Sequence, residues 1–170
     1  LRDQETIRVD LGTKYGFGSI TAEFFPVAHS IPDATGIALR TPAGLIIHTG
    51  DFKIDHTPVM NEPTDLSRLA SLGEEGVRLL CSDSTYADRM GATSSELLVG
   101  EALEQAILAA PGRVIIATFA SQIARVQQII DGAEASGRTV FVTGRSMERN
   151  IKMARELGYL HAAQGTIRNI

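Results

Sequence analysis

The sequence predicts an α/β fold, because strand-like and helix-like segments alternate along the chain. Three apolar runs, FFPVAHS, LIIHTGDF and LLCSDST, end on polar residues, which places His29, Asp51 and Asp83 where strands usually end. Ligands and metal ions bind preferentially at such strand ends. The second half reads in the order α-β-α-β-α, which is typical of parallel strands joined by right-handed crossovers.

The first half is predicted to be rich in strands. The turn TPAG, with Pro42 and Gly44, reverses the chain between two strands, so His29 and Asp51 are expected at the same end of the sheet. A helix over 65–76 then crosses to a parallel strand that delivers Asp83 to that edge. A glycine-containing loop is expected at 14–18. The predicted strands are 6–12, 19–28, 36–41, 44–50 and 77–83.

The second half shows clearer helix signals. Thr93 and Glu96 read as a capping box before a helix, and Ser121 and Ser146 stand at the expected N-caps of two later helices. Gly137 and Gly158 stand where those helices are expected to stop. The predicted order is strand 113–119, helix 121–137, strand 138–144 and helix 146–158, with no closing element after Leu160. The change of pattern near 90–95 predicts two domains, 1–93 and 94–170.

Composition narrows the function classes. The net charge of −4 gives no support for a generic nucleic-acid binder, although Arg and Lys cluster at 113–155 and leave a local basic groove open. Cys81 is the single cysteine, which excludes an internal disulfide and favours a reducing, cytoplasmic compartment. No apolar run is long enough to cross a bilayer, so we expect no membrane partner. Because Leu1 opens the chain and Leu160–Ile170 has no closing element, we expect an internal piece of a longer protein.

The first candidate site combines His29, Asp51 and Asp83. Imidazole nitrogen and carboxylate oxygen suit a divalent ion, and an aspartate can bridge two metals. The alternative is a hydrogen-bonded strand-end histidine and a turn aspartate. Asp83 either caps the following turn or orients a histidine. His48, His56 and His161 receive no site assignment.

The second candidate site lies at the turns TFAS and TGRS, which join strands to helices. Helix N-termini attract anions, so Ser121, Arg125, Arg145 and Ser146 could hold phosphates there. If the two strands are parallel neighbours, both turns lie on one edge. The alternative is that the two serines are ordinary helix caps.

Five segments, taken in order, resemble a known family: AHSIPDATGIAL, IIHTGDFKID, SDSTYADRMGATSSE, ATFASQIARVQQ and VTGRSM. They are similar to the ribonuclease J group of nucleases, which join a metallo-β-lactamase fold to a β-CASP domain. The similarity runs from about Ala22 to Leu160. It implies part of a metallo-β-lactamase αββα sandwich over 1–93, followed by part of a β-CASP domain with a parallel sheet over 94–170.

The resemblance also implies roles for single residues. His29 matches a metal ligand, and Asp51 matches the aspartate that bridges two metals, usually zinc and sometimes manganese. Asp83 matches the acidic residue of the first β-CASP motif, which supports a catalytic histidine further along. Ser121 and its neighbours match a segment that lines the RNA channel. The sequence departs from the family's pattern in four ways. No H-x-H-x-D-H motif is present, and the later β-CASP histidine motifs with the last metal ligand are absent too. Ala124 stands where members often have histidine, and SDSTYAD stands where SDSTNAE is commoner.

The implied function is a metal-dependent ribonuclease that hydrolyses RNA phosphodiester bonds in RNA processing and decay, including rRNA processing, from the 5′ end, internally or both. Zn²⁺ or Mn²⁺ would be the cofactor, RNA the partner, and a dimer or tetramer the assembly of the complete protein. The 170 residues alone are expected to be inactive, because they hold only two of the ligands. The alternatives are a DNA nuclease, a thioester hydrolase of the same fold, which the β-CASP-like half disfavours, and a non-catalytic RNA-binding paralogue.

Overall fold

The computed structural model describes residues 6–169, which form two units. The sheet unit comprises residues 6–28, 33–54 and 62–90, and the helical unit comprises 29–32, 55–61 and 91–169. Two short segments from the first half of the chain therefore belong to the helical unit. Residues 1–5 and residue 170, at the outer ends of the two predicted halves, lie outside the described range.

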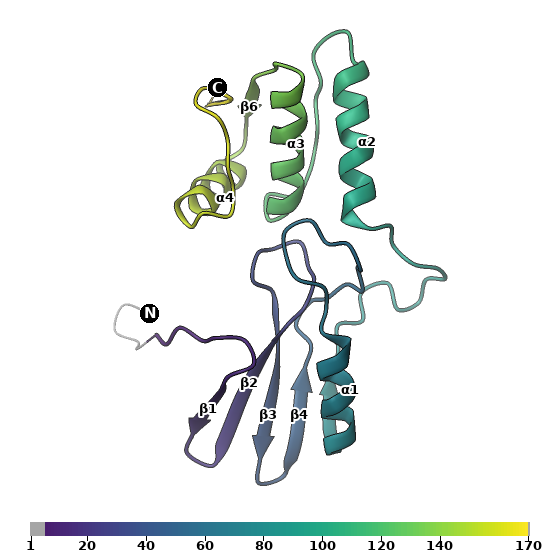
Figure 1. Ribbon diagram of the computed structural model, residues 1–170, viewed down its shortest axis with the longest axis vertical. Helices are drawn as coiled ribbons and strands as arrows, with labels where there is room; N and C mark the ends of the chain where they lie inside the picture. Colours follow the sequence, from purple (N-terminus) through teal and green to yellow (C-terminus); the bar gives the residue numbers. More distant parts are fainter. Residues whose placement is uncertain (1–5, 170) are drawn as a thin grey trace. The chain divides into compact units, whose positions relative to one another are not determined.

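A five-stranded sheet forms the first unit (Figure 1). Its neighbours follow chain order: β1 (Lys14–Phe17), β2 (Ile20–Pro26), β3 (Thr35–Thr41), β4 (Gly44–His48) and β5 (Val77–Cys81). The first four strands are antiparallel, whereas β4 and β5 are parallel. A parallel pair needs a crossover, which α1 (Leu66–Glu75) supplies. The predicted strands from β2 to β5, the TPAG turn and the crossover helix are confirmed.

The start of the sheet differs from the prediction. Residues 6–12 form no strand, and β1 occupies the segment where a loop was expected. Gly18, with φ of +61°, lies in the turn that folds β1 back onto β2, and Lys14 pairs with Glu23. Gly16 is tolerated inside β1 because it pairs with Thr21. At Gly16, strand pairing therefore outweighs the loop preference of glycine, whereas Gly18 forms the turn.

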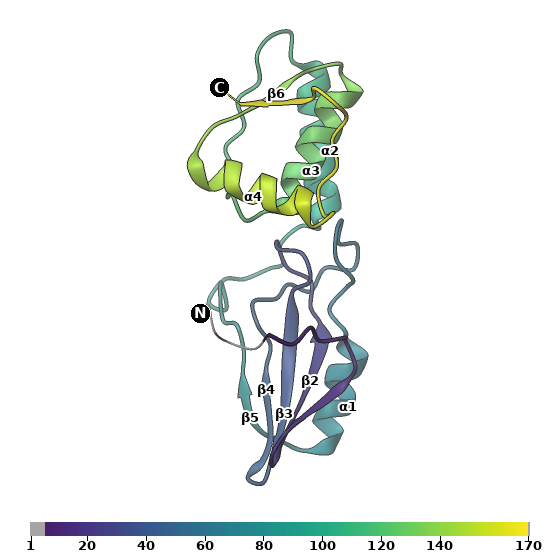
Figure 2. The same ribbon diagram turned by 90° about the vertical axis from the view of Figure 1, so that its left-hand side faces the viewer.

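The core of the sheet unit lies between the sheet and α1, which covers one face (Figure 2). Leu72 of α1 is fully buried, and Phe25 of β2 is 1% exposed. Helix α1 begins after Asp65, whose side chain accepts a hydrogen bond from the Arg68 amide at 2.8 Å. This N-cap satisfies one of the free donors of the first turn. The remaining buried core residues are Val27, Ala38, Leu45 and Ile47.

A buried carboxylate joins two strands to α1. Glu23 of β2 is 3% exposed, and it accepts hydrogen bonds from Arg68 at 2.6 Å and from Arg40 at 2.9 Å. Glu75, at the end of α1, binds Arg40 at 2.7 Å and completes the network. The hydrogen bond from Arg68, helped by Arg40, holds the pKa of Glu23 below its usual value of 4.5, although burial opposes this shift. Hence Glu23 stays charged inside the unit.

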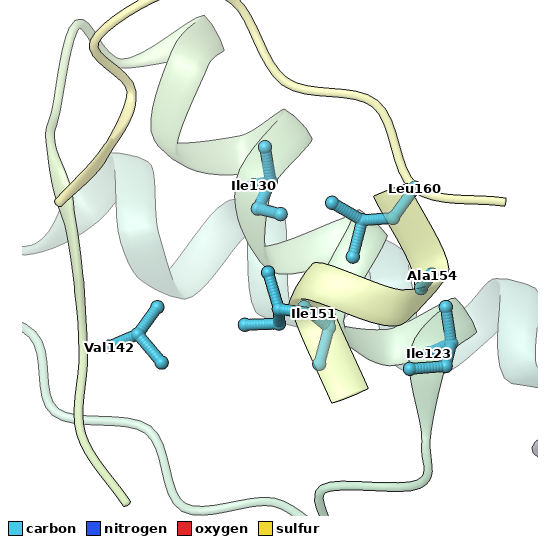
Figure 3. Close-up of a cluster of buried hydrophobic side chains, with 7 residues drawn as sticks. Ile123, Ile130, Val142, Ile151, Ala154 and Leu160 are labelled. Atoms are coloured by element: carbon cyan, nitrogen blue, oxygen red, sulfur yellow. The ribbon is translucent and has the colours of Figure 1, made fainter. Parts of the chain in front are cut away.

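The helical unit contains three long helices and a small parallel sheet. Its elements are α2 (Glu96–Ala109), α3 (Ile123–Ala135), β6 (Val140–Val142), α4 (Arg145–Glu156) and β7 (Ile167–Asn169). Strand β7 pairs with β6, so the expectation of no closing element after Leu160 is wrong. Figure 3 shows the buried cluster between α3, α4 and β6, which contains Ile123, Ile130, Val142, Ile151, Ala154 and Leu160.

The predicted strand 113–119 is wrong. The segment keeps the alternation of a strand, because Val114 and Ile116 are half-buried while Ile115 is 88% and Phe119 77% exposed. Within the described residues, however, it pairs with no other strand, and β6 pairs with β7 instead. Alternation alone does not make a strand, since the backbone groups need a partner.

The helix starts are also shifted from the predicted caps. Ser95, not Thr93, caps α2 by accepting the Leu97 amide at 3.2 Å, so the predicted capping box is wrong. The N-cap of α3 is Gln122 and that of α4 is Gly144, each one or two residues from the predicted serines. Gly137 and Gly158 have φ values of +64° and +80° directly after their helices, which confirms both predicted stops.

Helix α2 packs on α3 through small residues. A methyl group at Gly132 of α3 would lie 3.1 Å from Ile107, and one at Gly100 of α2 would collide with Gln128. Within α2, Ile107 is the buried residue, while Leu97 and Leu98 are exposed. Among the described residues, no helix has the length and apolar character needed to span a membrane.

We expect Glu23→Gln to destabilise the chain by about 2 kcal/mol, because both arginines lose a charged partner. A carboxyl whose pKa is lowered by folding contributes stability that is present above its unfolded pKa of about 4.5 and is lost as the pH falls through the folded pKa. Urea unfolding of the wild type should therefore lose stability below pH 4.5, and that of the variant should show a flatter profile.

Glu74→Gln is the matched control, because Glu74 is an exposed carboxylate on the same helix. This control should keep both the stability and the pH profile of the wild type. Equal losses in the two variants would contradict the role assigned to Glu23.

Candidate active site at the strand ends

The parallel pairing of β4 with β5 brings two polar turns together. Beyond the strands, the amide of Thr49 donates to the carbonyl of Cys81 at 3.0 Å. The Thr49 hydroxyl accepts the amide of Asp83 at 3.0 Å, and Thr49 itself is 5% exposed. The turn that carries Asp51 and the turn that carries Asp83 therefore begin side by side within the sheet unit.

The turn His48–Asp51 has a fixed backbone. Gly50 has φ of +64°, and a Cβ atom there would lie only 2.7 Å from the carbonyl oxygen of Thr35. This position therefore requires glycine for both conformation and space. The Gly50 amide donates to His48 Nδ1 at 3.0 Å, which assigns the proton of a neutral His48 ring to Nε2. His48, which received no site assignment from the sequence, is exposed and hydrogen-bonded within its own turn.

Asp51 is exposed at the end of this turn, and none of the described residues donates a hydrogen bond to its carboxylate. Its neighbours are well anchored. Lys53 forms a bridge with Ala28, where the Lys53 amide donates to the Ala28 carbonyl at 2.7 Å. The Thr64 hydroxyl accepts the Ala28 amide at 3.0 Å and donates to the Lys53 carbonyl at 2.8 Å. An available carboxylate thus stands on a rigid backbone.

Both oxygens of the Asp83 carboxylate are engaged. Oδ1 accepts the Thr85 amide at 2.8 Å, which is the turn-capping bond that the sequence suggested. Oδ2 accepts the Phe52 amide at 3.4 Å, from the residue directly after Asp51. Asp83 therefore acts within its own turn and also on the neighbouring one.

His29 belongs to the helical unit, whereas Asp51 belongs to the sheet unit. Asn61 fixes the backbone at His29, because its side-chain amide donates to the carbonyls of His29 at 3.0 Å and Ile31 at 2.7 Å. His29 Nδ1 lies 3.4 Å from the Ser30 hydroxyl. The shared metal site of His29 and Asp51 stays a prediction.

The donor chemistry of His29 and Asp51 fits a zinc or manganese ion. In the described part of the chain, no three His, Cys, Asp or Glu side chains gather closely enough to hold a metal ion. Two ligands alone give a weak site, since structural and catalytic zinc sites use three or four protein ligands. Taken singly, each of the two side chains offers a donor that suits such an ion.

The four predicted phosphate-binding residues all belong to the helical unit. Ser121, Arg145 and Ser146 are exposed near the starts of α3 and α4. The Asn150 side chain of α4 donates to the carbonyl of Ala120 at 2.8 Å, which ties the turn before α3 to α4. The two turns were expected on one edge of a parallel sheet. That expectation is wrong, because residues 113–119 form no strand, and the Asn150 side chain links the first turn to α4 instead.

Arg125 is placed differently from the other three residues. Its guanidinium forms an ion pair with Glu96, with Nη2 2.6 Å from the carboxylate. Ala124, where family members often have histidine, is 7% exposed on the buried face of α3. The assignment of the four residues to RNA binding stays a prediction.

Sequence reasoning overlooked Thr49, Thr64 and Asn61, whose side chains hold these turns in place. Thr49 stands inside the quoted motif IIHTGDFKID, so its position was visible. Its hydroxyl gains a role only when β5 pairs beside β4, and a sequence pattern does not show that contact. Thr64 and Asn61 bind backbone groups more than 30 positions away along the chain, including Ala28 and His29.

Comparison with known proteins shows which proteins the chain resembles. The family model described as "Ribonuclease J, beta-CASP domain" matches residues 111–170. The ribonuclease J of Helicobacter pylori (strain J99 / ATCC 700824) is 52% identical over 144 residues, which cover 85% of this chain and 21% of that protein. In sequence, the chain is similar to part of ribonuclease J.

A second relative, the ribonuclease J of Mycobacterium tuberculosis (strain ATCC 25618 / H37Rv), is 48% identical over 164 residues, which cover 96% of this chain and 29% of that protein. The chain thus spans between a fifth and a third of the length of these relatives. Its resemblance to ribonuclease J is confirmed in sequence.

A solved structure supports the fold. The crystal structure of a protein of unknown function from Enterococcus faecalis V583 matches with a TM-score of 0.63 at 19% sequence identity. The match covers 98% of this chain and 41% of that one. Together with the β-CASP match, it confirms the predicted class, part of a metallo-β-lactamase fold and part of a β-CASP domain.

We expect Gly50→Ala to destabilise the sheet unit by about 2 kcal/mol or more. Alanine pays about 1 kcal/mol for the left-handed conformation, and its Cβ also collides with the Thr35 carbonyl. Gly18→Ala is the matched control, because Gly18 has a similar φ of +61° with open space around it. Urea unfolding should show the larger loss for Gly50→Ala, and equal losses would remove the close contact from the explanation.

Proposed function

We propose that the protein carrying this chain is a metal-dependent ribonuclease that hydrolyses RNA phosphodiester bonds. The supporting observation is the exposed Asp51 carboxylate on a fixed turn beside Asp83, in a chain about 50% identical to proteins named ribonuclease J. An exposed carboxylate without a protein partner is available to a ligand, and its rigid backbone sets its position.

In this proposal His29 and Asp51 would hold a metal such as zinc or manganese, with Asp51 in the place of the family's bridging aspartate. When bound, the metal would supply an activated water and neutralise charge on the reacting phosphate. Asn61 steadies the backbone at His29, and the Ala28–Lys53 bridge steadies the strand ends from which both residues follow. A complete metal site needs further protein ligands besides His29 and Asp51.

Asp83 is proposed to orient a histidine of the site and to bind no metal itself. In the family, the matching acidic residue supports a catalytic histidine. Here its carboxylate already accepts the amides of Thr85 and Phe52, so its position is set before any substrate binds. A carboxylate held in this way can orient a histidine without moving itself.

RNA is proposed to bind the helical unit through its phosphates. Arg145 and Ser146 open α4, where backbone N–H groups and the helix dipole favour an anion. Ser121 precedes α3, and Asn150 holds its turn against α4. Arg125 contributes less charge, because Glu96 already balances it.

The wider assignment follows the family resemblance. We propose cleavage from the 5′ end, within the strand or both, in cytoplasmic RNA processing and decay. The complete protein is proposed to assemble from two or four copies. A matched comparison of single-stranded RNA and DNA of the same sequence tests the substrate, and preferential cleavage of the DNA would overturn the proposal.

In the whole protein, we expect Asp51→Asn to abolish RNA cleavage and lower the bound metal, because the neutral amide no longer bridges two cations. Metal content by mass spectrometry and cleavage of a labelled RNA are the two measurements. Asp88→Asn, which changes an exposed aspartate of the same unit, is the control and should behave like the wild type. Full cleavage by Asp51→Asn would exclude Asp51 from the mechanism.

We expect Arg145→Ala to weaken RNA binding. The negative slope of log K against log salt should become less steep by about 0.7 if the substitution removes one phosphate contact. Arg125→Ala should change the slope less, because Glu96 already pairs with Arg125. Fluorescence anisotropy at several salt concentrations measures both variants. Identical slopes for wild type and Arg145→Ala would remove Arg145 from the RNA interface.

A further inference from the structure

We propose that Thr49 is a positioning residue whose hydroxyl sets the place of Asp51 through Asp83. This inference rests on the proposed function and adds a residue to its machinery. Thr49 touches neither metal nor substrate in this proposal. It acts by holding the Asp83 turn at the distance that lets the Asp83 carboxylate reach the backbone beside Asp51.

The first observation is the bonding of the Thr49 side chain. Its hydroxyl accepts a hydrogen bond from the Asp83 amide at 3.0 Å and donates one to the Gly50 carbonyl at 2.7 Å. The hydroxyl therefore acts both as acceptor and as donor. The backbone amide of Thr49 also binds the carbonyl of Cys81 at 3.0 Å. Thr49 is 5% exposed, so water is not a ready substitute for these partners.

The second observation is that the contact closes a loop of interactions. Thr49 holds Asp83 by its amide, and the Asp83 carboxylate accepts the amide of Phe52 at 3.4 Å. Between Thr49 and Phe52 the chain contains only Gly50 and Asp51. The turn that carries Asp51 is therefore fixed at both ends by contacts that involve Asp83.

The third observation separates this role from general stability. Thr41, the last residue of β3, makes two bonds of the same kind: its hydroxyl accepts the Ala43 amide at 3.1 Å and donates to the Gly44 carbonyl at 2.9 Å. Thr41 belongs to the hairpin between β3 and β4 and has no link to Asp83. A loss that follows only Thr49 is therefore specific to the Asp51 turn.

The test compares Thr49→Val, Thr49→Ser and Thr41→Val in the whole protein. Valine keeps the shape and removes the hydroxyl, whereas serine keeps the hydroxyl. The measurements are Mn²⁺ and Zn²⁺ affinity by competition with a chromophoric chelator, kcat and KM for RNA, and hydrogen–deuterium exchange of peptides over 50–53 and 81–86. Urea unfolding reports the stability of each variant.

We expect Thr49→Val to lower metal affinity and kcat by about 10- to 100-fold, as is typical when a group that orients a metal ligand is lost. Its KM should change little, and exchange should accelerate in both peptides. Thr49→Ser should restore affinity and exchange, and Thr41→Val should resemble the wild type in both. Wild-type metal affinity and exchange in Thr49→Val, with only the stability loss seen in Thr41→Val, would overturn the proposal.

Two further outcomes are decided by the exchange data. If Thr49→Val does not fold, hydrogen–deuterium exchange of the wild-type protein is the test. Slow exchange of the Asp83 and Phe52 amides would support the proposal, and rapid exchange would overturn it. If the wild type neither binds metal nor cleaves RNA, the proposed function fails. The exchange of Thr49→Val and Thr49→Ser then still decides whether Thr49 sets the Asp51 turn.

Discussion

The parallel pairing of β4 with β5 is the constraint on which the candidate site depends. Without it, the turn after β4 and the turn after β5 would have no reason to meet. Because a parallel pair requires a crossover, the pairing depends on α1, whose Leu72 is fully buried against the sheet. Burial of apolar surface under α1 thus helps to place Thr49 beside Asp83.

Glu23 connects this crossover to the antiparallel part of the sheet. A buried carboxylate is costly unless it is paired, and here Arg40 of β3 and Arg68 of α1 both bind it. Replacing such a network by apolar residues could give similar stability. What the network adds is geometry, because Glu23, Arg40 and Arg68 bind together only when α1 lies in one register over β2 and β3.

The sequence predicted the sheet from β2 to β5 because the signals there are local: apolar runs, the TPAG turn and a helix that opens at Asp65. The sequence-based prediction failed where strand formation depends on a pairing partner elsewhere in the chain. Within the expected loop 14–18, residues 14–17 form β1 despite Gly16, since β2 supplies a partner. Residues 113–119 alternate like a strand yet pair with no described strand, since β6 pairs with β7.

The candidate site shows the same division between local and long-range information. Asp51 and Asp83 could be selected from the sequence because each ends an apolar run. Thr49 could not, although it lies two residues from Asp51, because its hydroxyl bonds to the amide of a residue 34 positions away. A residue that presents a ligand is visible as a polar break in an apolar pattern. A residue that positions the ligand is itself buried and looks like part of the strand.

Asp83 shows why the two interpretations of such a residue need not exclude each other. The sequence offered a turn cap or a functional carboxylate, and a carboxylate has two oxygens. One oxygen accepts the Thr85 amide within its own turn, and the other accepts the Phe52 amide beside Asp51. The local bond fixes the rotation of the carboxylate, which in turn directs the second oxygen at Phe52. Turn capping is therefore the means by which Asp83 reaches the neighbouring turn, and the structural role supports the functional one.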